Sequence, residues 1–148
     1  MAERVEGWWG VGRGARQVLG ACIFVVVNDI NWVFLMIIKS KNIYSVSHEN
    51  SKTNYEKLTI LINDFLKKYD LKINEISKLY VNRGPGSFAG IRNSFAVVKA
   101  IYVVKKIDYY CFSFNDFDKS NNNKYENIPN LCNKLKIKKN LINPIYLS

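Results

Sequence analysis

Short apolar runs separated by polar turns of a few residues restrict the fold of this chain more than any other feature. Ile23–Val27 is a continuous run of β-branched and aromatic residues, which is typical of a buried strand. Two further apolar runs follow after short polar turns, Trp32–Ile38 and the alternating run Ile43–His48. Strands joined by such short turns pair with their neighbours, so we expect a three-stranded antiparallel meander.

Helical and strand patterns alternate after the meander. A capping-box spacing at Thr53–Glu56 opens a helix over Thr53–Tyr69, whose apolar residues recur on one face. A short strand at Lys78–Val81, a second helix at Phe88–Val104 and a fifth strand at Tyr109–Ser113 follow. The order predicts an α/β domain with a mixed five-stranded sheet and two main helices.

The second helix is apolar on almost every side. Phe95–Val98 and Ala100–Val104 leave few polar positions, so this helix must be covered on more than one face. A sheet covers one face. The other is covered either by the rest of this small chain, as for a central helix, or by another protein.

Composition narrows the classes of function. The 148 residues suffice for one domain, and a formal net charge of +10 permits a polyanionic partner such as RNA without requiring one. The lysines of Lys134–Lys139 form either a solvated face or an RNA-facing patch. Three widely spaced cysteines and a single histidine, His48, signal no disulfide framework, metal site or catalytic triad, and no cofactor is predicted.

Residues 1–21 differ in composition from the remainder. They hold five of the eight glycines and no lysine, asparagine or isoleucine. We interpret them as an atypical extension that is disordered or foreign to the fold. The apolar stretch Val18–Val27 is too short to cross a membrane and has no cleavage site after it, which favours a cytoplasmic protein without a membrane partner.

A glycine-rich turn joins the fourth strand to the second helix. Gly84 and Gly86 permit unusual backbone angles or close approach, Pro85 stiffens the turn, and Ser87 is placed to cap the helix. Backbone N–H groups at a helix start suit an anion, so the Gly84–Ser87 turn predicts a small anion- or nucleotide-binding site. The alternative is a tight turn packed against a neighbouring segment.

The turn carries a family resemblance. Arg83–Arg92 reads R-G-P-G-S-F-A-G-I-R and resembles the R-G-P-G-S-F-T-G-L-R signature of the TsaB family, differing only at Ala89 and Ile91. Ser113–Phe117 lies where that family has an S-S-L-E-A-L type element, and Pro144–Ser148 is similar to its terminal P-x-Y-L-R. The motif residues that we single out are Arg83, Gly84, Pro85, Gly86, Ser87, Phe88, Gly90 and Arg92.

The resemblance implies a fold and a function. The fold is a single ribonuclease H-like, actin-like ATPase lobe. The function is that of a non-catalytic scaffold subunit for N6-threonylcarbamoyladenosine modification of tRNA, in a heterodimer with a TsaD-like catalytic subunit. A TsaE-like ATPase, tRNA held through the complex, and a homodimer when the partner is absent are further implied partners. The expected partner interface consists of Leu58, Ile62, Phe65, Ile91, Phe95, Val98 and Tyr102.

The chain also departs from the family pattern. The I-D-T-S element expected after the first strand is replaced by Val27–Ile30. Residues 22–117 cover the amino-terminal lobe, and residues 118–148 form a reduced tail where the family has a second lobe. Because this superfamily grips nucleotide between two lobes, we expect no ATP chemistry here. A degenerate, truncated paralogue is the remaining alternative.

Overall fold

The structure is a computed structural model, and it describes residues 22–28, 32–49, 57–86, 88–117 and 125–145. The extension predicted for residues 1–21, the capping box at residues 53–56 and the capping residue Ser87 lie outside the described residues.

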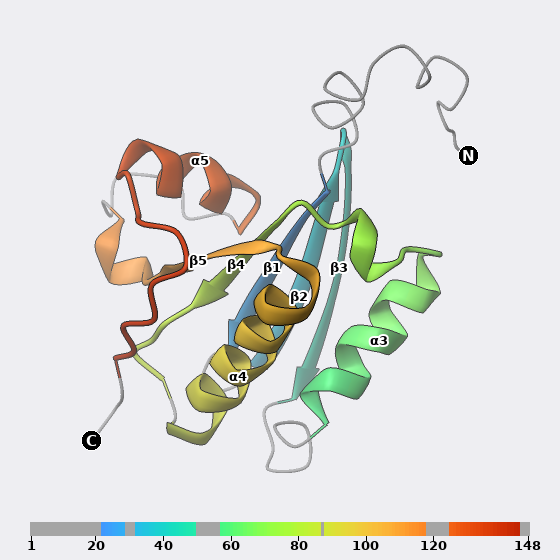
Figure 1. The fold of residues 1–148 in the computed structure, drawn as a ribbon, viewed down its shortest axis with the longest axis horizontal. Coiled ribbons are helices and arrows are strands. Elements are labelled where there is room, and N and C mark those ends of the chain that lie inside the picture. Colours follow the sequence, from blue (N-terminus) through green and yellow to red (C-terminus); the bar gives the residue numbers. More distant parts are fainter. Residues whose placement is uncertain (1–21, 29–31, 50–56, 87, 118–124, 146–148) are drawn as a thin grey trace.

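Five strands form one mixed sheet in the order β3-β2-β1-β4-β5 (Figure 1). Its first three strands pair antiparallel, which confirms the predicted meander. β4 and β5 run parallel to β1, because a helical connection precedes each of them. The strands are β1 (Cys22–Asn28), β2 (Trp32–Lys39), β3 (Asn42–Glu49), β4 (Lys78–Asn82) and β5 (Asp108–Phe112).

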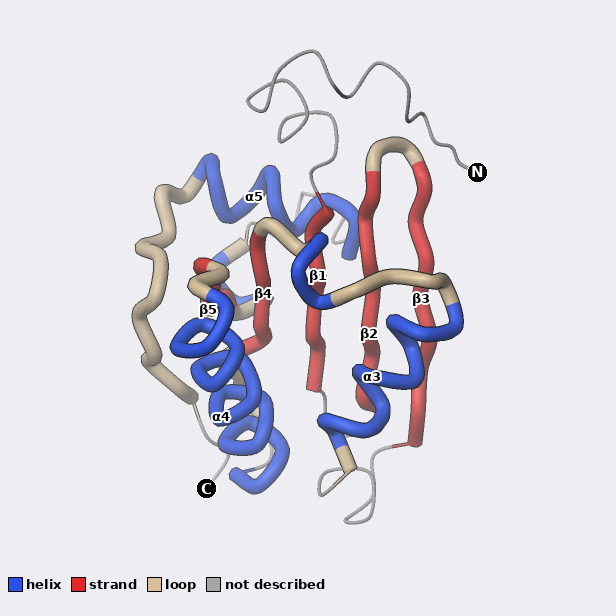
Figure 2. The backbone as a smooth tube through the Cα atoms, turned by 45° about the vertical axis from the view of Figure 1, so that its right-hand side comes forward, coloured by secondary structure: helices blue, strands red, loops and turns tan. Residues whose placement is uncertain are grey.

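Two main helices cover one face of this sheet. α3 (Leu58–Lys68) lies over the β2–β3 side and α4 (Phe88–Lys105) over the β4–β5 side (Figure 2). The short helix α5 (Ile128–Lys134) packs on the opposite face, where Ile128 and Cys132 meet strand residues. Three single-turn helices complete the described elements: η2 (Ile73–Glu75), η3 (Phe114–Asp116) and η4 (Tyr125–Asn127).

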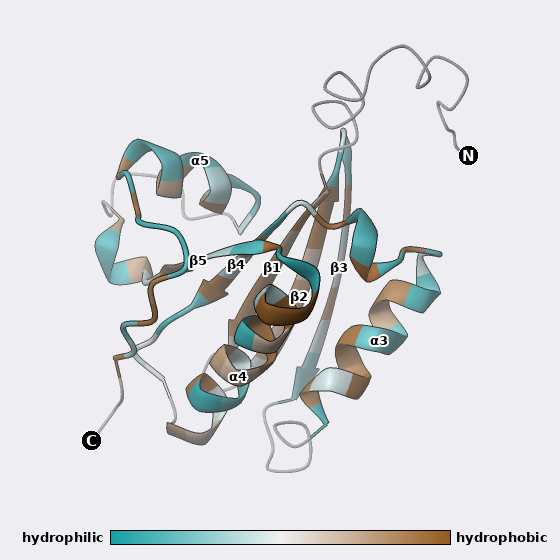
Figure 3. Cartoon of the chain, in the orientation of Figure 1, coloured by the Kyte–Doolittle hydropathy of each residue, from teal (hydrophilic) through white to brown (hydrophobic). Residues whose placement is uncertain are grey.

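Strand β1 shows how the sequence pattern generates two cores. Successive side chains on a strand point to opposite faces, so Phe24 and Val26 face α3 and α4 while Val25 and Val27 face α5. All four are at most 2% exposed, and β1 is hydrophobic along its length (Figure 3). A strand buried on both faces reads as a continuous apolar run, which is why Ile23–Val27 does not alternate.

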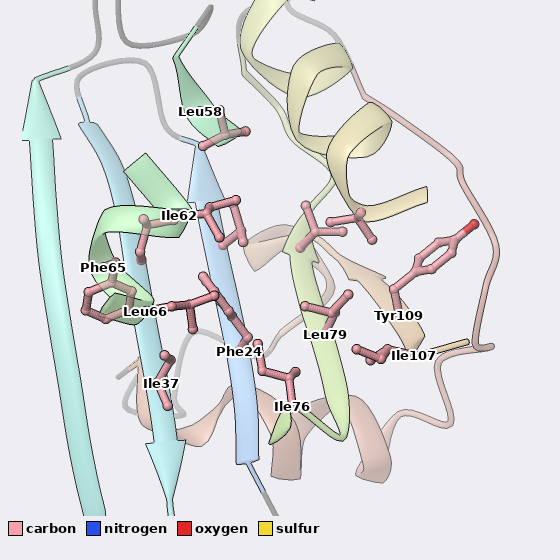
Figure 4. Close-up of a cluster of buried hydrophobic side chains, with 14 of the residues drawn as sticks. Phe24, Ile37, Leu58, Ile62, Phe65, Leu66, Ile76, Leu79, Ile107 and Tyr109 are labelled. Carbon is pink, nitrogen blue, oxygen red and sulfur yellow. The ribbon is translucent and has the colours of Figure 1, made fainter. Parts of the chain in front are cut away.

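The larger core lies between the sheet and the helices α3 and α4 (Figure 4). Phe24 of β1 packs edge-on against Phe65 of α3, with ring centroids 6.0 Å apart. The smaller core, on the α5 face, is built around Phe112 and Phe117, whose rings stack at 5.8 Å. No helix in the described segments is long and apolar enough to cross a bilayer.

Candidate functional site

The glycine-rich turn follows β4 and is held between two other segments of the chain. The backbone N–H of Arg83 donates to the carbonyl oxygen of Phe112 at 2.7 Å, at the end of β5. The carbonyl oxygen of Arg83 accepts from the N–H of Ile145, also at 2.7 Å. The turn is therefore a backbone junction between the sheet and the carboxyl-terminal segment.

Gly84 is required at this junction. Its φ of +115° is a conformation that side-chain-bearing residues rarely adopt, and a Cβ there would overlap the carbonyl oxygen of Ile145. Its N–H donates to Oδ1 of the buried Asn82 at 3.1 Å. At this position the glycine thus serves close packing against a neighbouring segment, as the packing alternative predicted, and its N–H is engaged within the chain.

The side chain of Arg83 connects the turn to two further segments. Its Nη2 lies 2.9 Å from Oδ1 and 3.2 Å from Oδ2 of Asp116, in η3. Its Nη1 donates to the carbonyl oxygen of Asn143 at 3.1 Å. Asp116 Oδ2 also accepts from the N–H of Ser113 at 3.0 Å, so one carboxylate fixes both the arginine and the start of η3.

These contacts bring together pieces that are far apart in the sequence. Arg83 begins the glycine motif, Ser113–Phe117 is the second element that resembles the family, and Asn143–Ile145 overlaps the start of the third. Of the remaining motif residues, Pro85 and Phe88 are exposed, whereas Gly86 and Gly90 are buried. The guanidinium carbon of Arg92 lies 5.1 Å from the centroid of the Phe88 ring. The motif organises the fold at this end of the sheet.

The described residues hold neither a metal-binding cluster nor an exposed thiol. They contain no group of three or more histidine, cysteine or acidic residues placed to hold a metal ion. All three cysteines are free and buried. Burial raises the pKa of Cys22 to about 11 and the pKa values of Cys111 and Cys132 to about 12, so these thiols stay neutral near pH 7.

The predicted partner-interface residues need a correction. Six of the seven are at most 6% exposed and pack in the larger core: Leu58, Ile62, Phe65, Ile91, Phe95 and Val98. Tyr102 is partly buried against the same core. Each helix turns its most regular apolar stripe toward its own sheet, because that sheet offers the nearest apolar surface. A partner would therefore meet the other sides of the two helices.

An apolar groove of about 430 Å³ lies between α3 and α4, and Ile62 is the one predicted interface residue that lines it. We call it the α3–α4 groove, and it is lined by Thr59, Ile62, Asn63, Leu66, Ile73, Ala96, Val97, Ala100 and Ile101. Ala96 and Ala100 are exposed and one helical turn apart, so they leave room between the helices. Their spacing was the one signal in the sequence that could have indicated the groove.

Comparison with known proteins gives two similar sequences. One is the "tRNA threonylcarbamoyladenosine biosynthesis protein TsaB" of Buchnera aphidicola subsp. Baizongia pistaciae, 36% identical over 66 residues that cover 38% of this chain and 30% of the relative. The other, of the same name, is from Buchnera aphidicola subsp. Schizaphis graminum, 25% identical over 62% of this chain and 43% of the relative. Both of these similar sequences carry the name of the family that Arg83–Arg92 resembles.

The fold agrees with this resemblance. The solved structure of YeaZ from Pseudomonas aeruginosa matches 63% of this chain and 44% of its own length, with a TM-score of 0.59 and 15% identity. The described sheet and helices are thus a ribonuclease H-like, actin-like lobe of the α/β class, as predicted. No family model matches the chain. The chain spans less than half the length of each TsaB relative above.

Proposed function

We propose that this chain acts in N6-threonylcarbamoyladenosine modification of tRNA, at the adenosine beside the anticodon, as a non-catalytic scaffold subunit. In this role it dimerises with a TsaD-like catalytic subunit. The names of the two TsaB relatives support the pathway. The α3–α4 groove is the observation that carries the docking role.

The groove has the shape and chemistry that a partner helix requires. Its walls are helices, its lining is mainly aliphatic, and the small side chains of Ala96 and Ala100 allow close approach. An amphipathic helix that docks in such a groove inserts residues spaced three and four apart. Ile60, Val103 and Val104, each more than half exposed, extend the apolar surface of the same two helices. We propose that helices of the two subunits pack here as one bundle.

The proposal assigns a part to each region. Residues 22–117 act as the TsaB-like lobe that supports the catalytic partner in the cytoplasm. Residues 118–148 stand in place of a second lobe, and residues 1–21 are an extension. A TsaE-like ATPase and tRNA join through the complex, and two copies of this chain pair through the same groove when the catalytic subunit is absent.

A pair of matched substitutions on α4 tests the docking surface. Ala100→Asp places a carboxylate in the groove, whereas Ala89→Asp places one on an exposed part of the same helix that does not line it. A carboxylate buried without a partner is strongly destabilising, so Ala100→Asp is expected to weaken binding to a TsaD subunit about tenfold or more. Ala89→Asp is expected to bind as the unmodified chain does.

The measurement is recovery of TsaD with the tagged chain, together with its dissociation constant and threonylcarbamoylation of tRNA by the mixture. Circular dichroism of both variants verifies that α4 is retained. Equal recovery with the two variants would refute the groove as the docking site. A complex that forms normally but gives no increase in tRNA modification would refute the scaffold role.

A further inference from the structure

The opposite face of the sheet has a second hollow, between α5 and the strands β1, β4 and β5. Its volume is about 440 Å³. We call it the lysine hollow, and it is lined by Ile23, Lys78, Tyr80, Tyr110, Pro129, Asn130, Cys132, Asn133, Lys136, Ile137 and Lys139. It lies on the far side of the sheet from the α3–α4 groove, so the two sites share no residue.

The lining of the hollow carries positive charge only. Three of its side chains are lysines and none is acidic. Lys139 Nζ lies 3.6 Å from Oδ2 of Asp108, which accounts for one of the charges. Within the described part of the chain, Lys78 and Lys136 have no ion-pair partner. Two ammonium groups thus remain available to an anion.

Tyrosines supply polar and aromatic surface to the hollow. Tyr80 and Tyr110 stack with ring centroids 5.1 Å apart, and Lys78 Nζ lies 5.9 Å from the centroid of the Tyr110 ring. Tyr80 is 4% exposed, and its hydroxyl makes no hydrogen bond to any described residue. A buried hydroxyl without a partner is costly, so this group favours a ligand that brings a hydrogen-bond acceptor.

We propose that the lysine hollow binds a phosphate ester, of the kind carried by a free nucleotide or by an RNA backbone. Lys78 and Lys136 neutralise the phosphate, and the Tyr80 hydroxyl donates a hydrogen bond to it. The amides of Asn130 and Asn133, on α5, lie on the wall beside it. The volume falls in the range of small-ligand sites, and a chain of net charge +10 draws polyanions toward it.

Replacement of lysine by glutamine, which is polar but uncharged, is the principal test. Lys78→Gln with Lys136→Gln removes the two free charges of the hollow. Lys67→Gln with Lys99→Gln removes two exposed lysines from α3 and α4 on the other face. The probes are a fluorescein-labelled single-stranded RNA, followed by anisotropy, and AMP, followed by calorimetry, with adenosine as the probe that lacks phosphate.

Loss of two phosphate contacts has a defined signature. The salt dependence of log K for single-stranded RNA is expected to become shallower by about 1.4, since each contact contributes about 0.7, and binding to weaken about tenfold. The Lys67 and Lys99 pair is expected to change binding less than about twofold. Asn133→Trp, which fills the hollow without changing charge, is expected to weaken binding and to reduce the salt slope, because the phosphate can no longer reach either lysine.

The outcomes separate the two phosphate sources. AMP binding that is lost in the Lys78 and Lys136 pair identifies a free nucleotide, and RNA binding without AMP binding identifies an RNA backbone. The proposal is overturned if both lysine pairs weaken RNA binding equally, if neither AMP nor RNA binds, or if adenosine binds as tightly as AMP. Ala100→Asp lies on the other face of the sheet and should leave phosphate binding intact. A failure of the docking proposal can therefore be distinguished from a failure of the phosphate-binding proposal.

Discussion

The two faces of the sheet differ in how completely their helices cover them. On one face, α3 and α4 bury the larger core and leave an apolar groove where they meet. On the other, the seven-residue α5 buries a smaller core and leaves a hollow rimmed by lysines. One sheet thus presents two chemically opposite surfaces, one suited to a protein helix and the other to an anion.

The contrast arises from the lengths of the covering elements. Helix α4 has 18 residues, whereas α5 has only seven and is therefore only about 10 Å long. The uncovered part of the second face lies beside a lysine-rich segment of the tail, so polar side chains complete it. A face covered by a short element is also expected to open locally more often.

The largest effect is expected in the larger core. Phe24→Ala removes a ring that is 1% exposed and packs against Phe65, and should lower the free energy of unfolding by about 3–5 kcal/mol. Ile43→Ala, at a side chain 47% exposed on β3, should cost less than about 1 kcal/mol. Urea denaturation measures both. Similar losses would show that the α3–α4 side is not the packed core.

A smaller and more local effect is expected on the second face. Ile128→Ala, at a fully buried position of α5, should cost about 2 kcal/mol, because the short helix can shift to reduce the cavity. Hydrogen exchange is expected to quicken in α5 and to stay slow in β1 and α4. If protection falls equally in all three, the two faces form one cooperative unit and the comparison fails.

The smallest effect near neutral pH concerns the buried thiols. Their pKa values are raised from 9.0 to about 11–12 by burial, so the unfolded chain loses thiol protons first as pH rises. Stability from this source is complete below about pH 9 and falls between about pH 9 and pH 12. Cys132, on α5, should react with iodoacetamide before Cys22 and Cys111. Peptide mass spectrometry after alkylation tests this order, and simultaneous labelling would contradict it.

Much of the fold could be predicted because local patterns carry it. The apolar runs and short turns predicted the meander, and the helical spacing predicted two main helices. The segment bounds shifted by a residue at some ends, as at β5, which runs over Asp108–Phe112 rather than Tyr109–Ser113. The short helix α5 begins at Ile128. Pro129 fits the first turn of that helix, where its missing N–H has no intrahelical partner to lose.

The candidate sites were harder to predict. A helix that is apolar on nearly every side does not reveal which side its own sheet will take, and so Phe95 and Val98 were assigned to a partner although they are core residues. The α3–α4 groove and the lysine hollow are each lined by residues from separate elements, and periodicity within one element cannot indicate such a site.

The sequence by itself determined the order of the elements, the buried apolar strand at Ile23–Val27 and the family resemblance carried by Arg83–Arg92. Only the tertiary structure decided that Arg83 would join Asp116 and Asn143, and that Gly84 would pack against Ile145. The physical reason is range: backbone preferences and apolar spacing act over a few neighbouring residues, whereas these contacts link positions 33 to 61 residues apart and form only after the sheet has brought its strands together.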